Sequence, residues 1–250
     1  MYLTVPGLVL RVTDYNDRDA LLQILTACHG RLTVRARGLR RKNSPLIAPC
    51  QLLAFDEFTL FESRGYYTVN EAKTTELFPE LRRDLNRLSL GTYFAQVAEV
   101  VSQEDLPNPE LLSLVLNCLY ALSKLGTEEA KVKAAFELRT ACLAGYEPDL
   151  SGCWRCGQPS PDRFDLSAGR LECRDCRDPD SAGIRIPVTP GVLEAMRYLC
   201  YCDPKKLFGF RLTPEGLTQL SQLTEAYLLT QLERSFSTLD FYKTLLTEST

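Results

Sequence analysis

A chain of 250 residues, 45% of them hydrophobic, is long enough for one large domain or two to three small ones. The net charge of −3 excludes a uniformly basic nucleic-acid-binding protein, so such a function would need local clusters of positive charge. A single histidine, His29, leaves little material for a hydrolytic triad. The sequence contains neither a run of about 20 apolar residues nor a secretion signal, so we expect a cytoplasmic protein that does not enter the membrane.

Residues 1–77 have the pattern of a small β domain. Stretches of alternating hydrophobic residues predict five strands, at 8–15, 20–27, 31–38, 51–63 and 65–73. Five strands in so short a segment favour a closed or partly closed barrel. In the third strand, Leu32, Val34 and Ala36 share one face and the arginines share the other, which we expect to be solvated.

Positive charge is densest in this third strand and the loop after it. The sequence RLTVRARGLRRK has six cations and no acidic residue: Arg31, Arg35, Arg37, Arg40, Arg41 and Lys42. Arginine donates paired hydrogen bonds to phosphate and stays charged, so this stretch predicts contact with a nucleic-acid backbone. Tyr15 and Tyr66 are candidates for stacking on bases. The alternative is a solvated face with ion pairs to Asp14, Asp17 or Glu57, and charge alone does not decide between the two.

Helical spacing of hydrophobic residues begins after Glu76. It predicts long helices at 109–125, 128–143, 189–202 and 213–236, with a polar segment between the second and third of them. The predicted organisation is therefore a barrel, a helical domain in two parts and an inserted module, with boundaries at 1–77, 78–148, 149–187 and 188–250. We expect the inserted module to be 149–187 and the helices on either side of it to form one bundle.

The inserted segment carries the strongest motif of the chain, C-x2-C-x16-C-x2-C. Its four cysteines are Cys153, Cys156, Cys173 and Cys176. Two C-x2-C turns can present four thiolates to one tetrahedral metal ion, which predicts a single structural Zn²⁺ with no open coordination position. A dithiol redox pair and two disulfides are the competing interpretations. Polar segments such as this one cannot build a hydrophobic core, so the metal would supply the folding free energy.

The other cysteines carry no comparable pattern. We expect Cys28, Cys118 and Cys142 to be ordinary buried thiols. Cys200 and Cys202 form a C-x-C in a helical segment, where core packing is the favoured interpretation, and we assign them no role.

The order of these segments resembles the RecO family of bacterial recombination mediators. The resemblance rests on DYNDRD followed by LLQILT, on HGRLTVRARGLRRKNS, and on the late CxxC…CxxC, and it covers nearly the whole chain. It implies an α+β multidomain protein: an N-terminal OB-fold barrel, a C-terminal all-α helical domain, and a zinc module that some members lack.

The resemblance also implies a function without a catalytic step. Family members bind single- and double-stranded DNA, anneal complementary strands, and with RecR help to load RecA onto DNA covered by single-strand-binding protein. Such a protein would be cytoplasmic and associated with the nucleoid. The helical domain would bind the acidic C-terminal tail of single-strand-binding protein, through Arg82, Arg83 and Arg87 or through Arg197, Lys205 and Lys206.

Two other classes of function are compatible with parts of the sequence. A zinc-stabilised adaptor would use the arginine strand to bind an acidic protein and would not touch DNA. A nuclease would need clustered carboxylates to hold metal ions, and Asp14, Asp17 and Asp19 are the one candidate group. These aspartates are better interpreted as a turn between two strands.

Overall fold

The computed structural model describes residues 1–176 and 183–248, so residues 177–182 of the predicted cysteine module lie outside the described residues. The chain forms two compact units. The first contains residues 1–126 and the C-terminal segment from Phe236, and the second contains residues 127–235. The units divide the helices differently from the boundaries predicted by sequence, which follow changes in the type of secondary structure.

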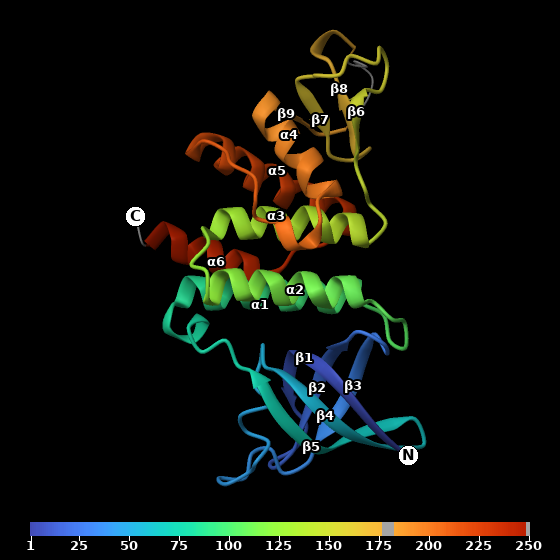
Figure 1. Cartoon of the computed structure of the whole chain (residues 1–250), viewed down its shortest axis with the longest axis vertical. Helices are drawn as coiled ribbons and strands as arrows, with labels where there is room; N and C mark the ends of the chain where they lie inside the picture. The colour runs from blue at the N-terminus through green and yellow to red at the C-terminus, as the bar shows by residue number, and fades with distance from the viewer. Residues whose placement is uncertain (177–182, 249–250) are drawn as a thin grey trace. The chain divides into compact units, whose positions relative to one another are not determined.

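The first unit begins with a five-stranded closed barrel (Figure 1). Its strands are β1 Tyr2–Asp14, β2 Ala20–Thr26, β3 Arg31–Ala36, β4 Phe55–Ser63 and β5 Tyr66–Glu76. They are hydrogen-bonded in the order β1-β2-β3-β5-β4, and β1 pairs with β4 to close the barrel. The β3–β5 pair is parallel and the others are antiparallel. This order confirms the predicted OB-type barrel.

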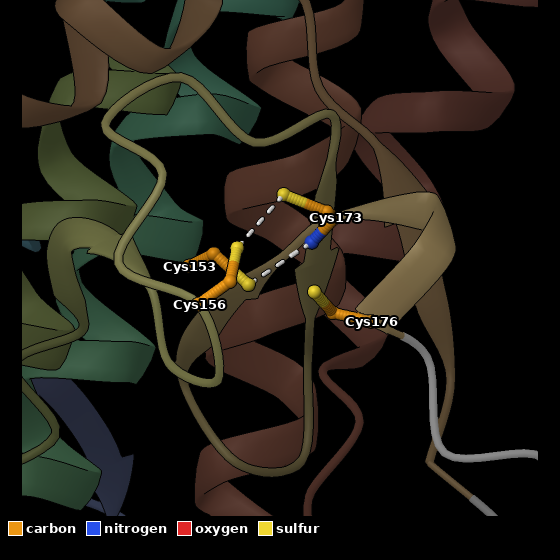
Figure 2. A group of neighbouring side chains, drawn as sticks. All are labelled: Cys153, Cys156, Cys173 and Cys176. Atoms are coloured by element: carbon orange, nitrogen blue, oxygen red, sulfur yellow. Dashed lines mark hydrogen bonds between the residues drawn. The ribbon is translucent and has the colours of Figure 1, made fainter.

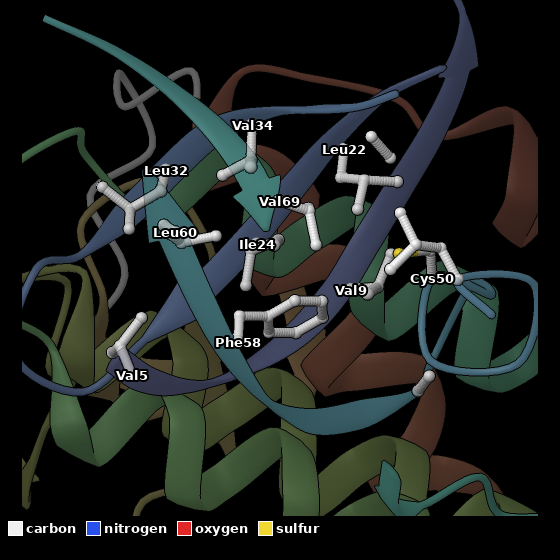
Figure 3. Close-up of a cluster of buried hydrophobic side chains, with 13 residues drawn as sticks. Val5, Val9, Leu22, Ile24, Leu32, Val34, Cys50, Phe58, Leu60 and Val69 are labelled. Atoms are coloured by element: carbon white, nitrogen blue, oxygen red, sulfur yellow. The ribbon is translucent and has the colours of Figure 1, made fainter. Parts of the chain in front are cut away.

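The barrel interior is filled by the inward-facing half of each strand (Figure 3). In β3 the alternation predicted from sequence holds, because Leu32, Val34 and Ala36 are buried and the residues between them are not. Phe58 and Ile24 are fully buried among them. Each such side chain contributes about 1.5–3 kcal/mol by leaving water, so the interior fixes which face of β3 points outward.

Three helices complete the first unit: α1 Leu85–Val101, α2 Pro109–Ser123 and α6 Ser237–Glu248. The first two begin at capping side chains, because Asp84 accepts a hydrogen bond from the Arg87 amide and Asn108 accepts one from the Leu111 amide. α6 packs on α1, where Phe236 contacts the ring of Tyr93 edge-on.

The second unit combines three helices with a small sheet. The helices are α3 Glu129–Leu143, α4 Pro190–Tyr201 and α5 Pro214–Leu232, and the sheet consists of β6 Asp149–Cys153, β7 Arg163–Asp165, β8 Arg170–Glu172 and β9 Arg185–Pro187. Between α3 and α5, the Lys133 ammonium lies 2.9 Å from Glu137 and 2.8 Å from Glu225. Lys133 and Glu137 are buried, so this cluster depends on all three charges being present.

Among the helices of the described residues, none has the length and hydropathy needed to span a membrane. The predicted fold class is confirmed: a barrel, C-terminal helices and a cysteine cluster on its own small sheet. One prediction about the cysteines is wrong, since Cys28 is exposed. It follows the end of β2 and lies in the turn to β3, where its side chain has no core to enter. Cys118 is buried as predicted and Cys142 is half-buried.

Candidate nucleic-acid interface and metal centre

A groove of about 880 Å³ crosses the outside of the barrel between β3 and β5. Three cationic side chains line it, Arg35, Arg37 and Arg64. A second hollow of about 550 Å³ contains Arg37 and Arg41 and shares Val69 and Asn70 with the first. Because Arg37 lines both, the two hollows form one continuous track along the outer face of β3 and its following loop.

Three of the six predicted cations are held by other groups of the first unit. Arg35 donates from Nε to Asp19 at 3.1 Å, and Arg40 forms an ion pair with Asp14. Arg31 donates from Nη1 to the carbonyl of Glu99 at 2.8 Å, which ties the start of β3 to α1. The alternative prediction of ion pairs within the protein is therefore correct for part of the cluster, and Asp14 was one of the partners it named.

The other three cations, Arg37, Arg41 and Lys42, are exposed. Within residues 1–176 and 183–248, none of them forms a salt bridge with a carboxylate. They lie at the end of β3 and in the loop that follows, where the backbone turns at Gly38 with φ +67°. This conformation is one that L side chains rarely adopt, so Gly38 allows the strand to turn sharply and bring Arg41 back beside Arg37. The groove therefore has a cluster of cations without internal neutralisation.

Aromatic rings gather at the other end of the groove. Tyr2, Tyr15, Phe61, Tyr66 and Tyr67 line it, and Tyr66 is 78% exposed. The rings of Tyr2 and Phe61 lie 5.3 Å apart, and the Arg35 guanidinium lies 4.9 Å from the centre of the Tyr15 ring. Exposed rings beside cations are the combination that binds single-stranded nucleic acids, since the rings stack on bases and the cations contact phosphates.

Tyr2, Phe61 and Arg64 were not among the site residues predicted from the sequence. Phe61 is 42% exposed, because it occupies the outward position of an alternating strand. Tyr2 faces it across the β1–β4 pair. The alternation of β4, with Phe58 and Leu60 buried, was the signal that could have placed Phe61 outside.

Asp19 anchors the cationic loop to the barrel. Its carboxylate accepts hydrogen bonds from the Gly38 amide at 2.8 Å and from Arg35. These bonds, the Gly38 amide first, lower the pKa of Asp19 to about 2. The side chain of Asn16 accepts bonds from the amides of Arg18 and Asp19, which confirms the predicted turn. Within the described residues, Asp14, Asp17 and Asp19 are not among the groups whose ligand atoms lie close enough together to hold a metal ion.

The four cysteines of the motif converge in the second unit (Figure 2). Cys153 ends β6, Cys173 follows β8, and the sulfurs of all four lie within 4.8 Å of one another. The sulfurs of Cys156 and Cys173 are 3.8 Å apart. A tetrahedral zinc ion with bonds of about 2.3 Å requires sulfurs about 3.8 Å apart, so the donor set fits such an ion.

Backbone amides of the module turn toward its sulfurs and carbonyls. The Cys173 amide donates to the sulfur of Cys153 at 3.3 Å, and the Gly157 amide donates to the carbonyl of Cys153 at 2.8 Å. Gly157 has φ +75°, the left-handed conformation needed where the chain turns around a ligand. Both C-x2-C segments are therefore already in a ligand-presenting conformation.

The thiols of this cluster differ in pKa, because ionisation of one opposes ionisation of its neighbours. Burial opposes ionisation of Cys153, but the amides of Cys156, Arg155 and Cys173 outweigh it and lower the pKa of Cys153 to about 6. Burial and the neighbouring sulfurs raise the pKa of Cys173 to about 12, and a hydrogen bond to Cys156 together with burial raises the pKa of Cys176 to about 11. Four thiolates cannot coexist here without a cation, so the group could hold a metal ion.

In each of the two cationic clusters predicted to bind an acidic tail, some side chains already donate hydrogen bonds within the protein. Arg82 donates to the carbonyl of Leu52 at 2.9 Å and Arg87 to that of Leu122 at 2.9 Å, while Arg83 is exposed. In the second unit Arg197 donates to the carbonyl of Leu150 at 2.8 Å, and Lys205 and Lys206 are exposed.

Comparison with known proteins gives one consistent result. Residues 1–78 match the model of the family described as "Recombination protein O N terminal", and residues 82–240 match "Recombination protein O C terminal". The chain is 32% identical over 247 residues to a protein named "DNA repair protein RecO" from Acetivibrio thermocellus, covering 98% of this chain and 97% of the relative. It is 32% identical to the protein of that name from Alkaliphilus metalliredigens, covering 97% and 99%. With two family models spanning both units and relatives of the same length, the chain belongs to the RecO family of DNA repair proteins.

Proposed function

We propose that this protein binds single- and double-stranded DNA through the groove of its barrel and anneals complementary strands. The observation that carries the proposal is the set of three exposed cations, Arg37, Arg41 and Lys42, at the end of β3 and in the loop after it. Arg37 lines the groove that holds the exposed aromatic rings, and Arg41 lines the adjoining hollow. Arg35 and Arg40 hold the loop through their ion pairs with Asp19 and Asp14. In this proposal, phosphate groups also contact the solvent-facing side of each guanidinium. Arg31 supports the base of the strand.

Annealing in this proposal needs no covalent step. A cationic track lowers the repulsion between two phosphate backbones and keeps the strands close together, which raises the rate of base pairing. The strands join by their own base pairing, and the protein acts as a mediator and not as an enzyme. From its family we further propose that it works with RecR to load RecA onto DNA covered by single-strand-binding protein, whose acidic C-terminal tail it binds, in the cytoplasm at the nucleoid.

We also propose that Cys153, Cys156, Cys173 and Cys176 hold one structural Zn²⁺. The support is the convergence of the four sulfurs within 4.8 Å and the fit of their spacing to a tetrahedral ion. The ion would keep all four thiols deprotonated and would add to the small hydrophobic core of the sheet, which includes Leu150, Phe164 and Leu171. Since the shell of four thiolates is closed, the ion would have no catalytic position.

The sharpest test replaces the exposed cations of the groove. Arg37→Ala, Arg41→Ala and Lys42→Ala together should weaken binding of a single-stranded oligonucleotide about 10- to 100-fold near 0.1 M salt, because three phosphate contacts and their counterion release are lost. Fluorescence anisotropy across a salt series measures the affinity, and the slope of log K against log salt should decrease in magnitude by about 2.

A matched control removes the same charge elsewhere. Arg83→Ala, Arg211→Ala and Arg234→Ala take away three exposed cations outside the groove, and this variant should bind DNA almost as the parent does. Equal loss in both variants would show that only net charge matters. Unchanged affinity in a folded groove variant would remove the DNA assignment and favour the alternative, an adaptor that binds an acidic protein through these arginines.

A further inference from the structure

Two cysteines outside the metal-binding motif bring their sulfurs together between two helices of the second unit. Cys142 lies in the last turn of α3 and Cys200 in the last turn of α4, and these helices pack on each other. Their sulfurs are 3.7 Å apart. A disulfide bond is about 2.05 Å long, so the sulfurs would have to approach by about 1.7 Å, a movement on the scale of a side-chain adjustment.

The two thiols differ in exposure and in charge environment. Cys142 is half-buried and accessible from solvent, whereas Cys200 is 5% exposed. Arg139 lies one turn before Cys142 and donates to the carbonyl of Cys200 at 2.5 Å, which places a guanidinium next to both sulfurs. The contact with Cys200 and the charge of Arg139 lower the pKa of Cys142 against burial and Glu147, while the same sulfur contact and burial raise the pKa of Cys200. Cys142 is therefore the thiol that an oxidant reaches first and that ionises more readily.

We propose that Cys142 and Cys200 form a redox-responsive dithiol, which a peroxide converts into a disulfide that links α3 to α4. The Cys142 thiolate attacks one oxygen of hydrogen peroxide, the O–O bond breaks, and the departing hydroxide takes up a proton to become water. Cys142 is then a sulfenic acid. The Cys200 sulfur loses its proton and attacks the sulfur of Cys142, the S–O bond breaks, and a second water leaves. Two thiols are oxidised and one peroxide is reduced.

The position of this bond gives it a structural effect. It closes the chain between residues 142 and 200, and the four cysteines of the metal-binding motif lie inside that loop. α4 contacts the module through Arg197, which donates to the carbonyls of Leu150 at 2.8 Å and Pro159 at 2.7 Å. A bond between α3 and α4 would hold both ends of the module in place and restrict the unfolded chain, so oxidised protein should unfold at a higher temperature.

The test uses the full chain with Cys28→Ser, because the exposed Cys28 would otherwise link two molecules. The protein is treated with an equimolar amount of hydrogen peroxide, remaining thiols are alkylated, and the unreduced digest is read by mass spectrometry. The expected product joins the Cys142 and Cys200 peptides with loss of about 2 Da. It should raise the melting temperature by about 5 °C, and dithiothreitol should reverse both changes.

Three variants make the result decisive. Cys202→Ser should keep the cross-link, Cys200→Ser should abolish it and leave Cys142 at the sulfenic or sulfinic stage, and Cys142→Ala with Cys200→Ala should show no rise in melting temperature on oxidation. The proposal is overturned if both peptides are recovered alkylated and separate, if Cys142 links equally to Cys202, or if the double variant shows the same rise. The outcome is independent of DNA binding, because neither cysteine belongs to the groove.

Discussion

Asp19 and Asp56 are two barrel carboxyls in opposite electrostatic situations. Asp19 is surrounded by donors, and its pKa is lowered to about 2, so it remains ionised and holds the cationic loop throughout the physiological range. Asp56 is fully buried in β4, and burial raises its pKa to about 6, against a single hydrogen bond from the Thr75 amide at 2.8 Å. Its Oδ2 atom accepts no hydrogen bond within the described residues.

The raised pKa of Asp56 predicts a cost to the fold at neutral pH. As the pH rises from about 4 to 6, the unfolded state ionises this group while the folded state resists, so the parent loses stability through that window. In Asp56→Asn that loss is absent. The change in unfolding free energy from pH 4 to pH 7.5 should therefore be more favourable to the folded state, by about 2 kcal/mol, in the variant than in the parent. Urea unfolding at the two pH values measures it.

The Asp19→Asn variant supplies the contrast. The lowered pKa of Asp19 stabilises the fold above pH 4, and that contribution disappears as the pH falls toward 2, so Asp19→Asn should cost stability at pH 7 and little at pH 2. If the pH dependence of Asp56→Asn runs parallel to that of the parent, Asp56 does not carry a raised pKa in solution.

Within single elements, the sequence predicted what periodicity and covalent geometry control. The faces of β3 and the start of α5 at Thr213, whose side chain accepts from the Gly216 amide, follow from residue types a few positions apart. The partners of the arginines did not follow in the same way. Which of Arg31, Arg35 and Arg37 stays free depends on where Glu99, Asp19 and Glu104 lie in space, and that is decided by packing between distant segments.

If the four cysteines hold the proposed zinc ion, the cysteine-rich sheet should be the element whose stability depends most on it. Removal of metal with a strong chelator should accelerate amide hydrogen exchange in β6, β7 and β8, because the two C-x2-C segments next to β6 and β8 would lose their common anchor. Protection of β1 to β5 should change little. Metal analysis of purified protein should give one zinc per chain. Absence of zinc, or equal deprotection of barrel and module, would contradict this expectation.

At the scale of the whole molecule, a net charge of −3 coexists with a local cluster of exposed cations at Arg37, Arg41 and Lys42. If three to six cations contact phosphates on a single strand, raising salt from 50 to 200 mM should reduce DNA affinity about 20- to 300-fold, and the annealing rate should fall with it. A strand-annealing assay with a fluorophore and quencher pair measures the rate. An annealing rate that does not depend on salt would mean that phosphate contact does not limit the process.

The order of barrel, helices and cysteine module along the chain was accessible from the sequence, but the grouping of the helices was not. Helical spacing after Glu76 covers α1, whereas α6 was not among the predicted helices, and such spacing cannot tell which neighbours a helix chooses. Their pairing depends on contacts such as Phe236 on Tyr93 and the bond from Thr238 to Gln96 at 2.5 Å, and the two residues of that bond are 142 positions apart in the sequence.

That pairing of α6 with α1 also sets an order of events during synthesis. The barrel, α1 and α2 leave the ribosome early, but the helix that covers α1 emerges only after all of residues 127–235. A nascent chain therefore displays part of α1 to solvent until α6 has been synthesised. Chains that terminate prematurely anywhere in the second unit would expose that apolar surface permanently, which marks them for recognition by chaperones and proteases.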